Sequence, residues 1–442
     1  MNAVKINKIK ILISFIIFLC FFSCRNNQNK VFEDNNSNNN HSLDLIIISD
    51  LHYFAPELGA GEPAFYRDKW TESKLTEHSK EIIVALFKEI SQLPEKNILI
   101  CGDLSHHGEK YNHLQLAEML NQLKEQGKNI FVIPGNHDIN NYSASRFEGR
   151  DYYLIDNVSP KDFSEIYKEF GYSKAISRDT TSLSYFAELD NQYDIICLDA
   201  AKYSIYSRNN MPSSGILNQN TLIWLQKVLT ERKKLNKNFI VMLHFNLIEH
   251  FPWQASNPIS NSYILMNANE LLEILNKFGV QLVFTGHFHA NDIVKHGNIY
   301  DIETGSAITF PHSYRIVNIK DKIASISTKN INDSAFFIDD QNFAEYSKNK
   351  TTRGLNNFFS HNWKKLNKNY DSTTTNKLKE SFAKIVFAHY YGDESIDLET
   401  KQFCDELIKS DDKILKLIGR ALKAVYNDPE PKDRNIEIKL NS

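Results

Sequence analysis

Short apolar runs that end in polar, metal-binding side chains are the feature that most constrains how this chain can fold. Leu43–Ser49, Asn97–Cys101 and Ile130–Ile133 have the length of strands and the continuous apolar character of strands covered on both faces. Helical spacing separates these runs, at Leu75–Ile90 and Tyr111–Gln126. Strands that alternate with helices predict an α/β fold with a layered core.

Five polar motifs stand at the ends of predicted strands. They are Asp50-Leu51-His52, Gly102-Asp103, Gly135-Asn136-His137-Asp138, His244 and Gly286-His287-Phe288-His289. The last two motifs follow the predicted strands Phe239–Leu243 and Leu282–Phe284. Because the carboxyl ends of strands in an open α/β sheet converge on one crevice, we expect the five motifs to meet in space.

The motifs together offer the donor atoms of a metal centre. The donors are the carboxylates of Asp50 and Asp103, the carboxamide of Asn136, and the imidazoles of His52, His137, His244, His287 and His289. Mixed oxygen and nitrogen donors without a thiolate suit manganese, iron or zinc. The set is too large for one ion with about four to six ligands and fits two ions that share a carboxylate. Two ions about 3.5–4 Å apart can clamp the attacking and leaving oxygens of a phosphoryl group.

In their order along residues 50–289, the five motifs resemble the full motif set of the calcineurin-like metallophosphoesterase superfamily. The resemblance implies two facing mixed sheets flanked by helices, with a hydroxide that bridges two metals as the nucleophile. It implies that one metal is held by Asp50, His52, Asp103 and His289, and the second by Asp103, Asn136, His244 and His287. It further implies that His137 serves the leaving oxygen, as proton donor or charge stabiliser, and that Asp138 orients His137 through a hydrogen bond.

Within that superfamily, the chain is more similar to bacterial class III cyclic-nucleotide phosphodiesterases, particularly lipoproteins with a helical C-terminal domain. Phe131–Asn141, Gly171–Ser184 and Asp199–Tyr203 carry this similarity. It implies a small phosphate-ester substrate, a 3′,5′-cyclic nucleotide. A phosphomonoesterase or nucleotidase on the same core, and a lipoprotein binding module without catalysis, are the alternatives. His106 stands where purple acid phosphatases, which share the motifs, have an iron-binding tyrosine, which argues against a purple centre.

The first 24 residues resemble a bacterial lipoprotein signal peptide. Lys5, Lys8 and Lys10 precede the apolar run Ile11–Phe22, which is shorter than the about 20 residues that span a membrane. Ser23-Cys24 then predicts Cys24 as a lipidated mature N-terminus. The protein is therefore expected outside the cytoplasmic membrane, anchored there or in the periplasm and outer membrane. A retained anchor and plain secretion are the alternatives. Residues 25–42 are polar and Asn-rich and predict a flexible tether.

Two domains follow the tether. Residues 43–330 are predicted to form the metallophosphoesterase domain, which closes with the strands Ile293–Val294, Ile299–Ile302, Tyr314–Ile319 and Lys322–Ser327. Residues 331–442 are predicted to form a helical C-terminal domain, because helical spacing recurs at Phe343–Phe359, Lys377–Tyr391, Leu398–Ile408 and Ile414–Val425.

The remaining features are less specific. A formal net charge of −3 gives no reason to expect binding to a nucleic-acid polymer, and no partner protein is evident. Cys101, Cys197 and Cys404 are scattered and predicted as buried free thiols. His106 and His107 are expected as exposed loop residues, with contact to the substrate phosphate as the alternative.

Overall fold

The computed structural model describes residues 42–208, 210–256, 260–332, 337–338, 341–365, 370–427 and 430–441. These residues belong to one compact unit. The predicted signal peptide, Cys24 and nearly all of the tether lie outside the described residues. Within them, no helix is both long enough and apolar enough to cross a lipid bilayer.

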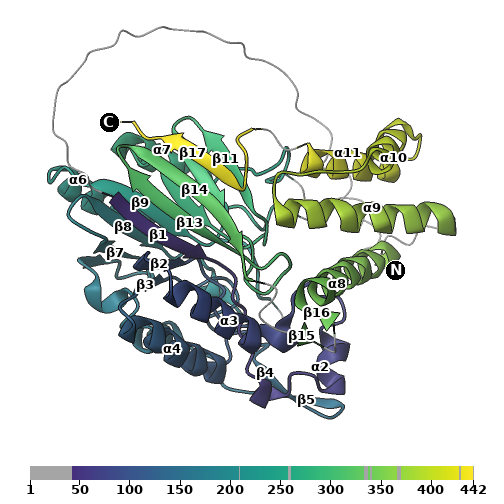
Figure 1. Ribbon diagram of the computed structural model, residues 1–442, viewed down its shortest axis with the longest axis horizontal. Helices are drawn as coiled ribbons and strands as arrows, with labels where there is room; N and C mark the ends of the chain where they lie inside the picture. Colours follow the sequence, from purple (N-terminus) through teal and green to yellow (C-terminus); the bar gives the residue numbers. More distant parts are fainter. Residues whose placement is uncertain are drawn as a thin grey trace, which may run out of the picture. The chain divides into compact units, whose positions relative to one another are not determined.

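Two mixed β-sheets form the centre of the molecule (Figure 1). The first has the strand order β17 (Asn435–Lys439), β14 (Ile323–Asn330), β13 (Ser313–Lys320), β1 (Ser42–Ile48), β2 (Asn97–Ile100) and β3 (Asn129–Val132). The second has the order β11 (Asp292–His296), β12 (Ile299–Glu303), β10 (Leu282–Thr285), β9 (Asn238–Leu243), β8 (Tyr193–Leu198), β7 (Tyr185–Glu188) and β6 (Ser177–Arg178).

The C-terminal part of strand β8, Ile195–Leu198, is continuously apolar because it is covered on both faces. Ile195 and Cys197 belong to the apolar cluster that the two sheets share, whereas Ile196 and Leu198 belong to a second cluster on the opposite face. Successive side chains of a strand point to opposite faces, so a strand covered on both sides needs apolar residues at every position. The predicted two-sheet sandwich is therefore confirmed.

Helices cover the outer faces of both sheets. α3 (Ser79–Ser91) and α4 (Lys110–Glu125) link the parallel strands β1, β2 and β3 and add their apolar faces to the shared cluster. α6 (Gln219–Lys233) and α7 (Ala268–Phe278) contribute to the second cluster. The shorter elements are α2 (Pro63–Asp68), α5 (Pro160–Ile166), the hairpin of β4 (Ser145–Glu148) and β5 (Asp151–Leu154), and that of β15 (Phe337–Ile338) and β16 (Gln341–Asn342).

The predicted C-terminal helices are present, and they are followed by a strand that we did not predict. The helices are α8 (Phe343–Lys365), α9 (Ser372–Tyr391), α10 (Leu398–Lys409) and α11 (Lys413–Tyr426). Aspartates cap the last three: the side chains of Asp371, Asp397 and Asp412 each accept hydrogen bonds from backbone amides of the first helical turn. The chain then returns to the first sheet, where β17 pairs antiparallel with β14 (Figure 1).

Candidate active site

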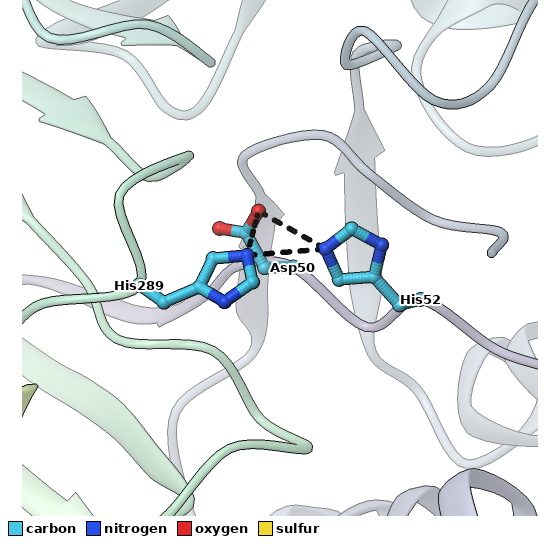
Figure 2. A group of neighbouring side chains, drawn as sticks. All are labelled: Asp50, His52 and His289. Atoms are coloured by element: carbon cyan, nitrogen blue, oxygen red, sulfur yellow. Dashed lines mark hydrogen bonds and ion pairs between the residues drawn. The ribbon is translucent and has the colours of Figure 1, made fainter. Parts of the chain in front are cut away.

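The first and fifth motifs meet at the strand ends, as expected. His289 Nε2 lies 3.3 Å from Asp50 Oδ1 and 3.1 Å from His52 Nε2, and His52 Nε2 lies 3.6 Å from the same carboxylate oxygen. Figure 2 shows the three side chains turned toward one another. All three donor atoms lie close enough together to bind one metal ion.

A second group of donors lies around Asp103. Its Oδ2 atom is 3.4 Å from His244 Nε2 and 3.6 Å from His52 Nε2, and His287 offers a further nitrogen close by. Asn136 Oδ1 lies 3.2 Å from His244 Nε2. A hydrogen bond fixes the orientation of the His244 ring: its Nδ1 donates to the Cys101 carbonyl over 2.7 Å. Its Nε2 therefore points toward the other donor atoms of the site.

The backbone around these residues is strained. Positive φ angles occur at Asp50 (53°), His52 (38°), Asp103 (49°), His287 (77°) and His289 (69°). Side chains other than glycine rarely adopt this conformation, and such strain is concentrated at functional sites. The neighbouring glycines permit close packing: a Cβ on Gly135 would overlap Asp103 Oδ1, and one on Gly286 would overlap Ser49 Oγ.

A buried carboxylate holds the fifth motif in place. Glu303 Oε1 accepts hydrogen bonds from the amides of Phe288 (3.1 Å) and Ala290 (3.3 Å). On the other side, the amide of His287 donates to Asp50 Oδ2 over 2.9 Å. These hydrogen bonds fix the backbone of the loop from Gly286 to Ala290 on two sides. The backbone in turn positions the side chains of His287 and His289.

His137 lies at the edge of the two donor groups and is about one-quarter exposed. Its Nε2 atom is 3.9 Å from Asp103 Oδ2, and its Nδ1 donates to the carbonyl of His106 over 2.6 Å. The orienting acceptor is therefore this carbonyl rather than Asp138. The Asp138 side chain instead accepts from the amides of Leu104, Ser105 and Gly135, and so joins the loops of the second and third motifs.

Two histidines that we expected to be exposed are packed against the site. His106 is 1% exposed, and His107 Nδ1 lies 3.0 Å from His137 Nδ1. Lys69 Nζ lies 3.2 Å from His107 Nε2, and Glu72 Oε1 lies 3.9 Å from His106 Nε2. The position of the histidine pair directly after the second motif was the available signal; the sequence offered none for Lys69 and Glu72.

The two groups of donor atoms have the properties of metal-binding sites, because hydrogen bonds within the protein do not satisfy all of their atoms. Asp50 Oδ1 and His52 Nδ1 are buried without a hydrogen-bond partner. Burial opposes charge on the imidazole of His244, yet the adjacent Asp103 carboxylate raises the pKa of His244 to about 9. Buried carboxylates that are surrounded by imidazole nitrogens are stabilised when a positive charge lies between them. Asp50, His52 and His289 would hold one ion, and Asp103, Asn136, His244 and His287 a neighbouring one.

Comparison with known proteins agrees with this geometry. The family model of calcineurin-like phosphoesterases matches residues 43–291, more than half of the 442 residues. The chain belongs to the calcineurin-like phosphoesterase family. It is a metallophosphoesterase, a hydrolase of phosphoester bonds.

The chain is similar to two proteins named "Probable cyclic nucleotide phosphodiesterase". The one from Moraxella catarrhalis is 20% identical over 256 residues, which cover 58% of this chain and 74% of the relative. The one from Coxiella burnetii is 26% identical over 193 residues, 43% of this chain and 59% of the relative, which is less than two thirds of that protein's length. A dimetal phosphatase from Danio rerio has a similar structure, with a TM-score of 0.47 and 14% identity over 65% of this chain and 96% of that one.

Proposed function

We propose that this phosphoesterase is a dinuclear phosphodiesterase that hydrolyses 3′,5′-cyclic nucleotides. The observation that carries the dinuclear part is the position of Asp103, whose Oδ2 faces His52 of the first donor group and His244 of the second. One carboxylate between two donor groups is what a shared ligand requires. The names of the Moraxella and Coxiella relatives support the cyclic-nucleotide part.

The side chains of the site would bind the metal ions, donate a proton to the leaving oxygen and exclude water. Bound metal ions would supply Lewis acidity, which lowers the pKa of water and neutralises charge on a phosphoryl group. His137 keeps its Nδ1 proton on the His106 carbonyl, so Nε2 is the nitrogen that faces the leaving oxygen, and it gives a proton there when the ring carries a second proton on Nε2. Burial of Asp50 and Asp103 excludes water from their carboxylates.

The test is hydrolysis of 3′,5′-cyclic AMP and of bis(p-nitrophenyl) phosphate by the purified protein, with manganese and then with a chelator. Cleavage of both esters that stops with the chelator supports the proposal. Cleavage of the synthetic diester alone removes the cyclic nucleotide as substrate. Faster cleavage of p-nitrophenyl phosphate would favour a phosphomonoesterase or nucleotidase, and metal-loaded protein inactive on every ester would favour a binding module. Metal analysis after growth in unsupplemented medium distinguishes manganese, iron and zinc.

We also propose that the protein is exported and anchored through Cys24. The support is the sequence alone, in which three lysines, an apolar run and Ser23-Cys24 follow one another. Mass spectrometry of the N-terminal peptide from membranes tests this: a diacylglyceryl group on Cys24 is expected. An unmodified peptide that begins before Cys24 would contradict it.

A further inference from the structure

The loop of the fifth motif packs against the C-terminal helices. Phe288 stands between the two histidines of the motif, and its ring meets the ring of His389 in α9 edge-on, with the centroids 5.3 Å apart. The ring also meets that of Tyr263, in the loop after the fourth motif, at 4.5 Å. Phe288 packs against an apolar cluster that is separate from the two clusters of the sheets. This cluster consists of Ala290 of the loop, Leu355 of α8, and Ala383 and Tyr390 of α9.

Hydrogen bonds tie the same loop to the end of α9. Asn291 stands two residues after His289 and is fully buried. Its Nδ2 donates to the carbonyl of Tyr390 over 2.7 Å and to Ser313 Oγ over 2.9 Å, and its Oδ1 accepts from the amide of Gly305 over 3.2 Å. One buried side chain thus joins the last turn of α9 to the chain that follows the second histidine.

The end of α9 approaches this loop so closely that it requires a glycine. Gly392 ends the helix with a φ angle of 83°, and a Cβ there would lie 2.5 Å from the carbonyl oxygen of Asn291. Atoms at this distance overlap, so an alanine would push the end of the helix and the loop apart.

The position of the loop matters for both donor groups. His289 belongs to the group of Asp50, and His287 belongs to the group of Asp103. A shift of the loop backbone would therefore displace one ligand of each ion. Partners that orient metal ligands from outside change metal affinity or activity by about 10- to 100-fold when they are lost.

We propose that α9 positions His287 and His289 for metal binding, through its contacts with Phe288 and Asn291. The inference rests on the metal ligands of the proposed function and holds for any phosphoester substrate. Phe288, Asn291 and Gly392 act on the two histidines through the backbone of the loop, so they are positioning residues. The C-terminal helices thereby support a metal centre whose assigned ligands all lie in the sheet domain.

The first test is manganese binding by chelator-treated protein, measured by calorimetry for the wild type, Phe288→Ala, Phe288→Leu and the control Phe403→Ala. Phe403 is buried in a cluster of the C-terminal helices that includes no residue of the loop. We expect the dissociation constant to rise roughly 10- to 100-fold in Phe288→Ala. Phe288→Leu restores an apolar side chain and should recover most of this loss, and Phe403→Ala should match the wild type. An unchanged constant in Phe288→Ala overturns the proposal.

A spectroscopic measurement separates positioning from general destabilisation. The visible absorption of the cobalt-loaded protein reports the geometry of the ligands, and urea unfolding reports stability. We expect Phe288→Ala and Phe403→Ala both to lower the free energy of unfolding, because each removes a packed ring. Only Phe288→Ala should change the cobalt spectrum. A spectrum equal to that of the wild type would reduce Phe288 to a packing residue and overturn its positioning role.

A pair of glycine variants tests the contribution of α9 itself. Gly392→Ala should raise the manganese dissociation constant roughly 10-fold. Gly279→Ala, at the end of α7, has a similar φ angle of 74°, but its added Cβ would meet only Lys233 Nζ, at 3.8 Å. This control should bind manganese as the wild type does, and equal constants in the two variants overturn the role of α9.

These binding measurements need no turnover, so the two proposals fail separately. A wild-type protein that binds manganese but cleaves no cyclic nucleotide contradicts the proposed substrate and leaves the positioning role to be decided by the variants above. A wild-type protein that binds no manganese, cobalt, iron or zinc overturns both proposals.

Discussion

The Nδ1 atoms of His107 and His137 lie 3.0 Å apart, and their two rings stack with an angle of 10° between the planes. Burial, together with the nearby Lys69 ammonium group, lowers the pKa of His107 well below its usual value. A neutral ring can lie against His137 without placing a second positive charge beside it. His107 therefore restricts the orientation of the His137 ring.

Replacement of His107 by phenylalanine should keep the stacked ring and remove its nitrogens. We expect kcat to fall roughly 10- to 100-fold, the scale for losing a hydrogen-bonded partner of a site residue, while both metals stay bound. Steady-state kinetics and metal analysis check this. His296→Phe, on an exposed strand end, is the control. A kcat equal to that of the wild type would show that the contact has no catalytic consequence.

His137→Ala should retain the metals and lose activity. His137 Nε2 faces the site, but the group of Asp50, His52 and His289 and the group of Asp103, His244 and His287 could each hold an ion without it. We expect a loss of roughly 10²- to 10⁴-fold in kcat, the usual contribution of general acid catalysis. The loss should shrink for esters with a good leaving group such as p-nitrophenolate. Loss of a metal ion from this variant would mean that His137 is a ligand.

Asp103→Asn should remove both activity and metal. Its carboxylate faces three imidazoles, at 3.4 Å from His244 and 3.6 Å and 3.9 Å from His52 and His137. An amide of the same shape cannot carry the negative charge that a shared ligand needs. We expect about one metal ion or less per chain by mass spectrometry, from an expected two. Asp405→Asn on the surface of α10 is the control, and two retained ions would refute the shared-ligand assignment.

Metal removal should destabilise the fold. Without an ion, the carboxylates of Asp50 and Asp103 stay buried without a metal cation to neutralise their charge. Manganese at 100 times its dissociation constant should add about 2.7 kcal/mol to the free energy of unfolding. Urea unfolding with manganese and with chelator measures this difference. The difference should be smaller in Asp103→Asn, which is expected to keep one ion at most; an equal difference there would place the stabilising ion elsewhere.

Stability should also depend on a buried histidine between the core and the helices. His389 Nδ1 lies 2.7 Å from Glu394 Oε1 and 3.8 Å from Asp292 Oδ2, with Glu303 and His250 nearby. Burial would lower the pKa of His389, but the Glu394 and Asp292 carboxylates raise it to about 9.

Because the folded state holds this proton more tightly than the unfolded state, the contribution is complete below about pH 6.5 and is lost as the pH rises through about 9. We therefore expect the free energy of unfolding to fall between pH 7 and pH 9, by at most on the order of 3 kcal/mol from this group. His389→Gln should make the profile flatter. A wild-type profile that rises over this range would contradict the assignment.

Much of the fold could be predicted because its central strands are covered on both faces. The runs that became β1, β2, β3, β8, β9 and β10 have apolar interiors, apart from Asp44 in β1 and Asp194 in β8, and the five motifs adjoin five of these strands. The strand β17 was missed, because an edge strand of sequence NIEIK within a polar tail has no such run. Its pairing with β14 is decided by tertiary packing, not by local pattern.

The same distinction separates the two parts of the site. Asp50, Asp103 and His287 were predictable because each follows a strand by two or three residues. Lys69 and Glu72 were not, since their position depends on contacts between distant segments. The hydrogen bond from Thr351 to Ser73, for example, crosses 278 residues of sequence.

The return of the chain to β14 has a practical consequence for any shortened form of the protein. Removing everything after Asn330 would delete the helices and also strip β17 from the sheet. The eight residues of β14 would then present free backbone amides and carbonyls to solvent along an edge of the sheet. Such an edge is a template for pairing with another molecule, so the truncated protein should self-associate rather than behave as an isolated catalytic domain.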